Sequence, residues 1–156
     1  MTRQYEHFIN GKWATPAEGA YFESTNPATL EVLDAAARGS KADVDTAVRA
    51  ARAAFENPLW RDLSQTKRGH LLRKLGDLVG EHAEELAQME TADNGKLLRE
   101  MRGQLATLPE YLYYYAGLAD KVQGSQIPTM NPAVLNYTQR EPLGVHGRHC
   151  TDDQHA

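Results

Sequence analysis

The stretch Ser40–Phe55, SKADVDTAVRAARAAF, carries the clearest local structural signal in the chain. Val44, Val48, Ala51 and Phe55 recur at spacings of three and four residues, which places them along one face of an α-helix. The stretch opens with a serine, and the aspartate three positions later is typical of a capping box. The pattern predicts a helix over residues 40–55 with one apolar face.

Two more helical stretches follow. Ser64 is a candidate N-cap for a leucine-rich helix, and the helical pattern continues from Glu81 to Asp93, where Gly95 provides a C-terminal stop. The third stretch runs from Leu97 to Val122 and contains Pro109, which favours a kink because proline cannot donate the helical hydrogen bond. The side chains expected to face inward are Leu71, Leu72, Leu75, Leu78, Val79, Leu86 and Met89.

Short strands frame these helices. Residues 7–14 are typical of a hairpin, because the central Asn10-Gly11 pair tolerates the positive φ values of a two-residue turn. Tyr21–Thr25, Glu31–Ala36 and Val134–Arg140 are further strand candidates. The chain has no alternating βαβ series of its own. The predicted fold class is therefore α/β, with mostly long helices and short strands.

Composition excludes several classes of protein. The chain has 156 residues, 41% hydrophobic and 24% charged, which suits one soluble globular unit. A net charge of -4 and a pI of about 5.8 argue against nucleic acid or an anionic membrane as partner. No secretory signal or membrane-spanning run is recognisable, and the single Cys150 excludes an internal disulfide. A cytoplasmic location is therefore expected.

Few side chains suggest chemistry by themselves. No glycine pattern of the dinucleotide- or phosphate-binding type occurs. Tyrosines 111, 113, 114 and 115 could stack nucleobases, but no basic patch accompanies them, so packing is the favoured interpretation. Residues 93–96, Asp-Asn-Gly-Lys, are typical of a helix end followed by a turn.

The last eleven residues concentrate potential metal ligands. Histidine and cysteine suit zinc or nickel, but the segment lacks the apolar periodicity that would hold ligands in place, so a metal site is a minor alternative. A nucleophilic role for Cys150 is disfavoured, because no fixed base or oxyanion donor is recognisable around it. The potential ligands are His146, His149, Cys150, Asp152, Asp153 and His155.

A series of short motifs runs in order from Phe8 to Val145. Its members are Phe8-Ile9-Asn10-Gly11-Lys12-Trp13, Asn26-Pro27-Ala28-Thr29 with Glu31-Val32, Asp43-Val44-Asp45, Trp60-Arg61, Arg68-Gly69, Glu90-Thr91-Ala92-Asp93-Asn94-Gly95-Lys96, Tyr114-Tyr115-Ala116-Gly117 and the run 136–145, NYTQREPLGV. Together they resemble the N-terminal segment of the NAD(P)-dependent aldehyde dehydrogenase superfamily. Residues 146–156 do not resemble it.

The resemblance implies a domain organisation. Residues 1–125 would form the N-terminal part of the cofactor-binding domain, as outer helices and a hairpin around an incomplete Rossmann core. Residues 126–145 would form a β-element that pairs subunits into homo-oligomers, and residues 146–156 would be a non-family tail. The resemblance also implies a monovalent-cation site built from main-chain oxygens, with Ser24, Thr25 and Asp93 at the matching positions.

The resemblance further implies a reaction. In the family a cysteine thiolate attacks an aldehyde, hydride passes to NAD or NADP, and a glutamate activates the water that releases the acid. An asparagine side chain and a backbone N–H stabilise the oxyanion. None of these catalytic or cofactor-binding residues maps onto this chain. The expectation is a truncated protein that is inactive alone and binds no cofactor.

A further expectation concerns the origin of the tail. Shifting the reading frame by one base after Val145 permits an apolar, family-like continuation, so we expect a frameshift there. A coding sequence with no family-like text in any frame would contradict it.

The alternative function is that of a non-catalytic stub that pairs with full-length dehydrogenase subunits through exposed strand edges. Without the rest of the cofactor domain, the inward-facing side chains must contact one another or stay exposed, which predicts a marginally folded chain.

Overall fold

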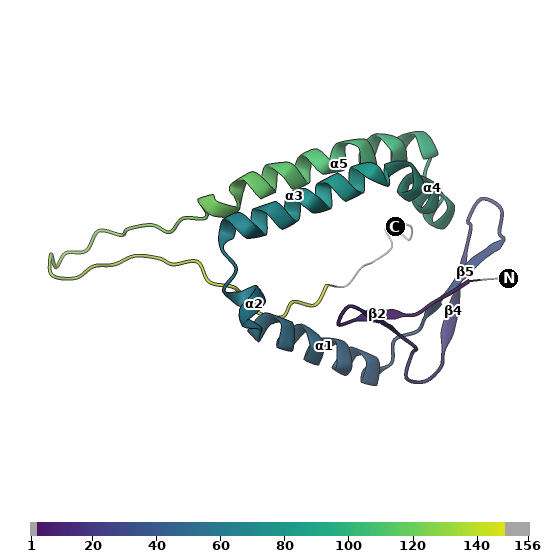
Figure 1. Cartoon of the computed structure of the whole chain (residues 1–156), viewed down its shortest axis with the longest axis horizontal. Helices are drawn as coiled ribbons and strands as arrows, with labels where there is room; N and C mark the ends of the chain where they lie inside the picture. Colours follow the sequence, from purple (N-terminus) through teal and green to yellow (C-terminus); the bar gives the residue numbers. More distant parts are fainter. Residues whose placement is uncertain (1–2, 149–156) are drawn as a thin grey trace.

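The computed structural model describes residues 3–148, in which short strands at one end join a set of longer helices and a thin arm extends from the other end (Figure 1). The strands are β1 (Arg3–Tyr5), β2 (His7–Ile9), β3 (Lys12–Ala14), β4 (Tyr21–Thr25) and β5 (Val32–Ala37). The helices are α1 (Lys41–Glu56), α2 (Pro58–Arg61), α3 (Gln65–Glu81), α4 (Ala83–Asn94) and α5 (Leu98–Leu118), followed by the 3-10 turn η1 (Ala119–Lys121).

The strands form two small sheets. Strand β5 is central in a three-stranded sheet, with β1 parallel on one side and β4 antiparallel on the other. Strands β2 and β3 form a separate two-stranded hairpin, which confirms the predicted turn at Asn10 (φ 53°) and Gly11 (φ 74°). Strand β1 was missed, because its partner lies 31 residues away: the Arg3 N–H donates to Asp34 Oδ1 over 3.1 Å.

Helix α1 begins as the sequence predicts. Ser40 is its N-cap, and Ser40 and Asp43 form a complete capping box. Asp43 Oδ1 also accepts from the Ala17 N–H at 2.9 Å, and its Oδ2 lies 3.8 Å from His7 Nε2. The Ser40 backbone N–H is the main reason that the pKa of Asp43 is lowered. These contacts tie the N-terminal end of α1 to the hairpin and to the loop that follows it.

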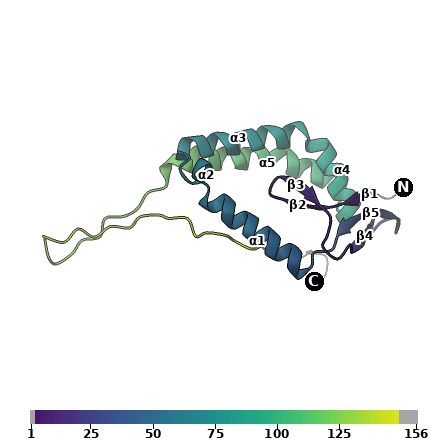
Figure 2. The same ribbon diagram turned by 60° about the horizontal axis from the view of Figure 1, so that its bottom comes forward.

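Most of the apolar face of α1 is exposed in the part of the chain that the structure describes, although Gly144 and Val145 lie near Phe55 at its C-terminal end. Val44 is 56% exposed and Val48 is 49% exposed, and no α1 residue is buried. Both views place α1 away from the α3–α5 pair, next to α2 and the hairpin (Figures 1 and 2). The expectation that uncovered apolar side chains stay exposed holds for this helix and also for α3, where Leu71 is 51% and Leu75 is 48% exposed.

Helix α2 was not expected, and a single arginine secures it. Asn57 caps it, with its side chain accepting from the Leu59 N–H at 3.0 Å. The Arg68 guanidinium donates to the carbonyl oxygens of Trp60 (2.8 Å) and Arg61 (3.2 Å) and lies 4.6 Å from the centre of the Trp60 ring. Arg68 therefore fills the role of a C-terminal cap for a helix of only four residues.

Helices α3, α4 and α5 form the packed part of the molecule, named here the helical layer. Helices α3 and α5 lie side by side and antiparallel in both views (Figures 1 and 2). Two buried glycines of α3 allow this approach: a Cβ on Gly69 would lie 2.7 Å from the Ala116 carbonyl oxygen, and one on Gly76 would lie 2.7 Å from Tyr113 Cε1. The Tyr113 hydroxyl donates to Asp77 at 2.7 Å, which raises the pKa of Tyr113.

The boundaries of these helices follow the predicted signals. Ser64 caps α3, with its side chain accepting from the Lys67 N–H, and Gly95 (φ 75°) ends α4 in the left-handed conformation. Helix α5 runs through Pro109 without interruption, so Pro109 is accommodated at a buried position. Three hydrophobic residues are buried within residues 3–148, namely Ala35, Ala87 and Met101.

The predicted strand over Val134–Arg140 is wrong. After η1 the chain leaves the helices as two extended limbs, named here the arm (residues 122–145). The arm projects away from the helices and then returns beside α2 and α1, where Val145 lies near Phe55 and Trp60 (Figures 1 and 2). One isolated bridge, Gln126 to Tyr137, joins the limbs, with the Ile127 N–H donating to the Asn136 carbonyl oxygen over 2.9 Å. The limbs pair at this one bridge and join neither sheet of the structure, so the alternating pattern does not extend into a ladder.

Candidate functional site

The candidate site lies where the three-stranded sheet faces helix α4. Ser24 occupies the next-to-last position of β4, and a register shift between Ser24 and Thr25 marks an irregularity at the end of that strand. Asp93 occupies the last turn of α4, where the chain approaches its left-handed stop at Gly95. Local signals therefore set both ends of the contact: the strand ends before Asn26-Pro27 and the helix ends at a glycine.

The structure brings two of the three predicted cation-site residues together. The Ser24 hydroxyl donates to Asp93 Oδ1 over 2.5 Å, across 69 residues of sequence. Thr25 lies next to Ser24 in the chain, but its side chain takes no part in this hydrogen bond. A carboxylate near a helix C-terminus faces the negative end of the helix dipole, and the hydroxyl donor offsets that unfavourable field.

Main-chain oxygens are available beside this pair. The last carbonyl groups of an α-helix have no partner within the helix. In α4 the Thr91 carbonyl oxygen accepts from the Gly95 N–H at 3.0 Å, whereas no backbone N–H of residues 3–148 outside the helix donates to the Asp93 carbonyl oxygen. Carbonyl oxygens are suitable ligands for a hard cation, so the end of α4 could contribute such a ligand.

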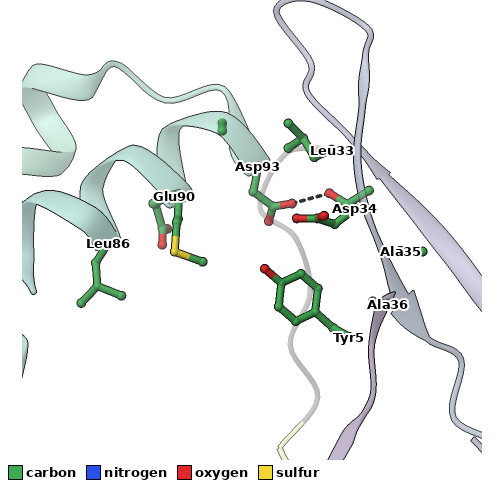
Figure 3. Close-up of a pocket in the computed structure, with 11 residues that line it drawn as sticks. Tyr5, Leu33, Asp34, Ala35, Ala36, Leu86, Glu90 and Asp93 are labelled. Atoms are coloured by element: carbon green, nitrogen blue, oxygen red, sulfur yellow. Dashed lines mark hydrogen bonds between the residues drawn. The ribbon is translucent and has the colours of Figure 1, made fainter. Parts of the chain in front are cut away.

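The Ser24–Asp93 contact lies in the wall of an open pocket of about 490 Å³. Figure 3 shows Asp93 on α4 facing Asp34 on β5, with the Tyr5 hydroxyl directed toward α4. The pocket has a largely apolar wall with three carboxylates, and its lining is Tyr5, Ser24, Leu33, Asp34, Ala35, Ala36, Leu86, Met89, Glu90, Ala92 and Asp93. Sequence reasoning missed Tyr5 and Asp34, because only the parallel pairing of β1 with β5 brings them here.

Each carboxylate in the pocket already accepts a hydrogen bond from the protein. Asp34 accepts from the Arg3 N–H, Asp93 from Ser24, and Glu90 Oε1 from Asn94 Nδ2 at 2.9 Å. The pocket holds no cysteine or histidine in its lining. Its chemistry therefore suits binding through oxygen atoms more than nucleophilic catalysis.

The other predicted ligands and aromatic residues can be placed in part. His146 lies in a shallow hollow beside Phe55 and Trp60, whereas the remaining tail ligands (His149, Cys150, Asp152, Asp153 and His155) fall outside the described residues. Residues 3–148 contain no cluster of three or more potential metal-ligating His, Cys, Asp or Glu side chains. Tyr113 packs against α3, as the packing interpretation requires, while tyrosines 111, 114 and 115 are exposed.

Comparison with known proteins identifies the family. A model of the aldehyde dehydrogenase family matches residues 13–148. The chain belongs to the aldehyde dehydrogenase family. The match begins five residues after Phe8 and ends three residues after Val145, so it includes the first three residues of the segment expected to lie outside the family.

Individual relatives match the same region. The putative aldehyde dehydrogenase DhaS of Bacillus subtilis is 46% identical over 142 residues, covering 90% of this chain and 28% of its own length. A hydroxybutyrolactone dehydrogenase of Acinetobacter baylyi is 45% identical over 143 residues, covering 92% of this chain and 29% of its own. The chain thus spans less than a third of the length of these relatives.

Solved structures agree with the fold. The NAD+ complex of the aldehyde dehydrogenase from Bacillus cereus matches with a TM-score of 0.83 and 41% identity, over 90% of this chain and 28% of that protein. The mixture of helices and short strands is therefore the architecture of the N-terminal part of an aldehyde dehydrogenase. No helix within residues 3–148 is both long and apolar enough to cross a bilayer.

Proposed function

We propose that this chain serves as the N-terminal part of an NAD- or NADP-dependent aldehyde dehydrogenase, which oxidises an aldehyde to a carboxylic acid. The supporting observation is that the family match runs through residues 13–148, while the chain spans about 28% of the length of its relatives. The Bacillus cereus relative was solved with NAD+, which supports a nicotinamide cofactor for the whole enzyme. We expect residues 1–125 to belong to the cofactor-binding domain and residues 126–145 to the oligomerisation element.

The proposed reaction needs a thiolate nucleophile, a glutamate base and oxyanion donors. We assign none of these roles to residues 1–156, because the motifs of this chain supply the framework rather than the reacting groups. The chain alone is therefore expected to produce no aldehyde-dependent NADH or NADPH and to bind neither nucleotide. The pocket at Ser24 and Asp93 contributes no catalytic group to this proposal.

A chimera tests the proposal directly. Residues 13–145 of this chain would replace the matching segment of the Bacillus cereus enzyme, and NAD(P)H formation would be followed with a panel of aldehydes. We expect an active chimera, because 41% identity and a TM-score of 0.83 indicate compatible packing. Aldehyde-dependent NAD(P)H formation by the 156-residue chain alone would contradict the proposal that none of its residues is catalytic. A folded chimera that forms no NAD(P)H would contradict the proposal that this chain serves as the N-terminal part of such an enzyme.

We also propose that Ser24, Thr25 and Asp93 form part of a monovalent-cation site. The hydrogen bond between Ser24 and Asp93 and the free carbonyl groups at the end of α4 support this assignment. Potassium should raise the thermal midpoint of the active chimera more than tetramethylammonium at equal ionic strength, because the methyl groups of tetramethylammonium prevent oxygen ligands from coordinating it. The Asp93→Ala variant should lose this difference, and Asp45→Ala, at an exposed position of α1, should keep it.

A second candidate function is pairing with full-length subunits as a non-catalytic stub. The arm supports it, because its limbs expose backbone groups and large apolar side chains: Met130 and Leu143 are fully exposed, and Leu135 is 71% exposed. Co-expression of the tagged chain with the full-length relative, followed by affinity purification, tests the pairing. Leu135→Asp should abolish recovery, whereas Leu59→Asp, at an exposed leucine of α2, should not. Equal recovery of both variants would contradict pairing through the arm.

A further inference from the structure

The chain contains two Asn-Gly sequences in contrasting surroundings. Asn10-Gly11 forms the turn of the β2–β3 hairpin, and Asn94-Gly95 forms the C-terminal end of α4. In an Asn-Gly pair the backbone nitrogen of glycine can attack the side-chain amide carbon of asparagine, since glycine has no side chain to obstruct the approach. We propose that Asn10 is a site of spontaneous deamidation and that the fold protects Asn94 from the same reaction.

The reaction is balanced with water alone. The deprotonated Gly11 nitrogen forms a bond to Asn10 Cγ, the C–N bond to the side-chain amide breaks, and ammonia leaves, giving a five-membered succinimide. Water then opens the ring at either carbonyl group, producing aspartate or isoaspartate at position 10. No oxidant, metal or enzyme takes part, so the rate depends on how readily the glycine nitrogen and the asparagine side chain reach each other.

At Asn10 little opposes this approach. Asn10 and Gly11 are exposed, and a Cβ added at Gly11 would meet no atom within 4 Å. No hydrogen bond within residues 3–148 engages the Asn10 side chain, and the Gly11 N–H donates to no backbone carbonyl group there. The hairpin has three residue pairs and no third strand, so it opens at low cost.

At Asn94 four contacts oppose the same approach. The Gly95 N–H, the nitrogen that would attack, donates to the Thr91 carbonyl oxygen at 3.0 Å. The Asn94 side chain is held at both ends, with Nδ2 donating to Glu90 Oε1 and Oδ1 accepting from the Lys96 N–H, each at 2.9 Å. Pro27 covers the glycine, since a Cβ on Gly95 would lie 2.7 Å from Pro27 Cγ. Attack therefore requires the last turn of α4 to unfold.

Isoaspartate at position 10 would have a structural effect. It lengthens the backbone by one methylene group within a two-residue turn whose geometry fixes the register of the hairpin. Phe8 faces Trp13 in that register, with ring centres 5.1 Å apart, and His7 faces Ala14 beside the start of α1. The modification would therefore loosen the hairpin and its contact with Asp43.

The test compares both sites within one molecule. The 156-residue chain is incubated at mildly alkaline pH, in buffer and in concentrated guanidinium chloride, and tryptic peptides 4–12 and 75–96 are quantified by mass spectrometry over time. The rate in denaturant divided by the rate in buffer gives the protection of each site and removes the intrinsic effect of neighbouring residues. We expect the protection of Asn94 to exceed that of Asn10 by about tenfold or more, because its attack requires local unfolding.

Two variants sharpen the result. Asn10→Gln should abolish the mass change in peptide 4–12, since glutamine would form a less favoured six-membered ring, and should leave peptide 75–96 unchanged. Pro27→Ala should raise the rate at Asn94 in buffer but not in denaturant. Equal protection at the two sites, or greater protection at Asn10, would overturn the proposal.

Discussion

Helix α1 and the helical layer formed by α3, α4 and α5 carry the same kind of sequence pattern but differ in how much of it they bury. Both carry apolar side chains at helical spacing, and both begin at a serine cap. The helical layer buries Met101, Ala87 and two glycines, whereas α1 buries nothing. Periodicity therefore predicts which face of a helix is apolar, but whether that face is covered depends on tertiary partners.

The contrast predicts that stability is concentrated in the helical layer. The energy of a buried side chain comes from contacts and from removal of apolar area from water. A side chain that is half exposed gains little of either. Matched substitutions in the two regions should therefore differ strongly, and the urea-unfolding free energy of the 156-residue chain, followed by circular dichroism, measures the difference.

The largest effect is expected at Met101, which is 2% exposed. Met101→Ala should lower the unfolding free energy by about 2–5 kcal/mol, because it removes buried atoms and leaves a cavity. Met89→Ala is the matched control, since Met89 is also helical but 53% exposed. Equal losses for the two variants would contradict a core centred on the helical layer.

A smaller loss is expected where α3 and α5 approach each other. Gly69→Ala should cost about 1–3 kcal/mol, because the new methyl group meets a backbone carbonyl oxygen that cannot turn away. Gly103→Ala serves as control, since its Cβ would meet no atom within 4 Å and alanine favours a helix by up to about 1 kcal/mol. Stabilisation by both substitutions would show that the two helices do not pack as described.

The contact between α4 and α5 should depend on pH. The Arg102 guanidinium donates to both Glu84 oxygens, at 2.8 and 2.6 Å, and these hydrogen bonds chiefly lower the pKa of Glu84 from 4.5 to about 2. A lowered pKa in the folded state stabilises above 4.5, and that contribution is lost as the pH falls toward 2. The effect is modest because both groups are exposed.

Thermal midpoints provide the measurement for this pair. Arg102→Ala should lower the midpoint above pH 4.5, and its difference from the unmodified chain should shrink as the pH approaches 2. Arg99→Ala, on an exposed position of the same helix, should leave the pH profile unchanged. A constant difference between the Arg102 variant and the unmodified chain at every pH would exclude Glu84 as the cause.

The smallest effect is expected on α1. Val48→Ser should change the unfolding free energy by less than about 0.5 kcal/mol, because Val48 is half exposed in this chain. In the active chimera the same substitution should cost clearly more if the rest of the enzyme covers this face. A large loss in the 156-residue chain alone would mean that α1 already packs against another part of it.

Much of this fold was predictable because its signals are local. The caps at Ser40 and Ser64, the stop at Gly95 and the Asn10-Gly11 turn depend on neighbouring residues, and the structure has all of them. Strand β1 depends on a distant partner and was missed, while the arm has the alternation of a strand but no sheet to join. For the same reason the Ser24–Asp93 pair came from family resemblance rather than from spacing.

Helix α1 has one more property that follows from how it is held. Asp43 at its N-terminal end accepts a hydrogen bond from the Ala17 N–H. Its C-terminal end continues into α2, where Arg68 donates to the Trp60 carbonyl oxygen. Both ends of α1 are therefore held by contacts outside the helix. Six of its sixteen residues are alanine, the residue that favours a helix without packing. Free helices fray from their ends, but here the ends are the fixed points. The rate of amide hydrogen exchange should therefore be nearly uniform along α1, from its N-terminal to its C-terminal end.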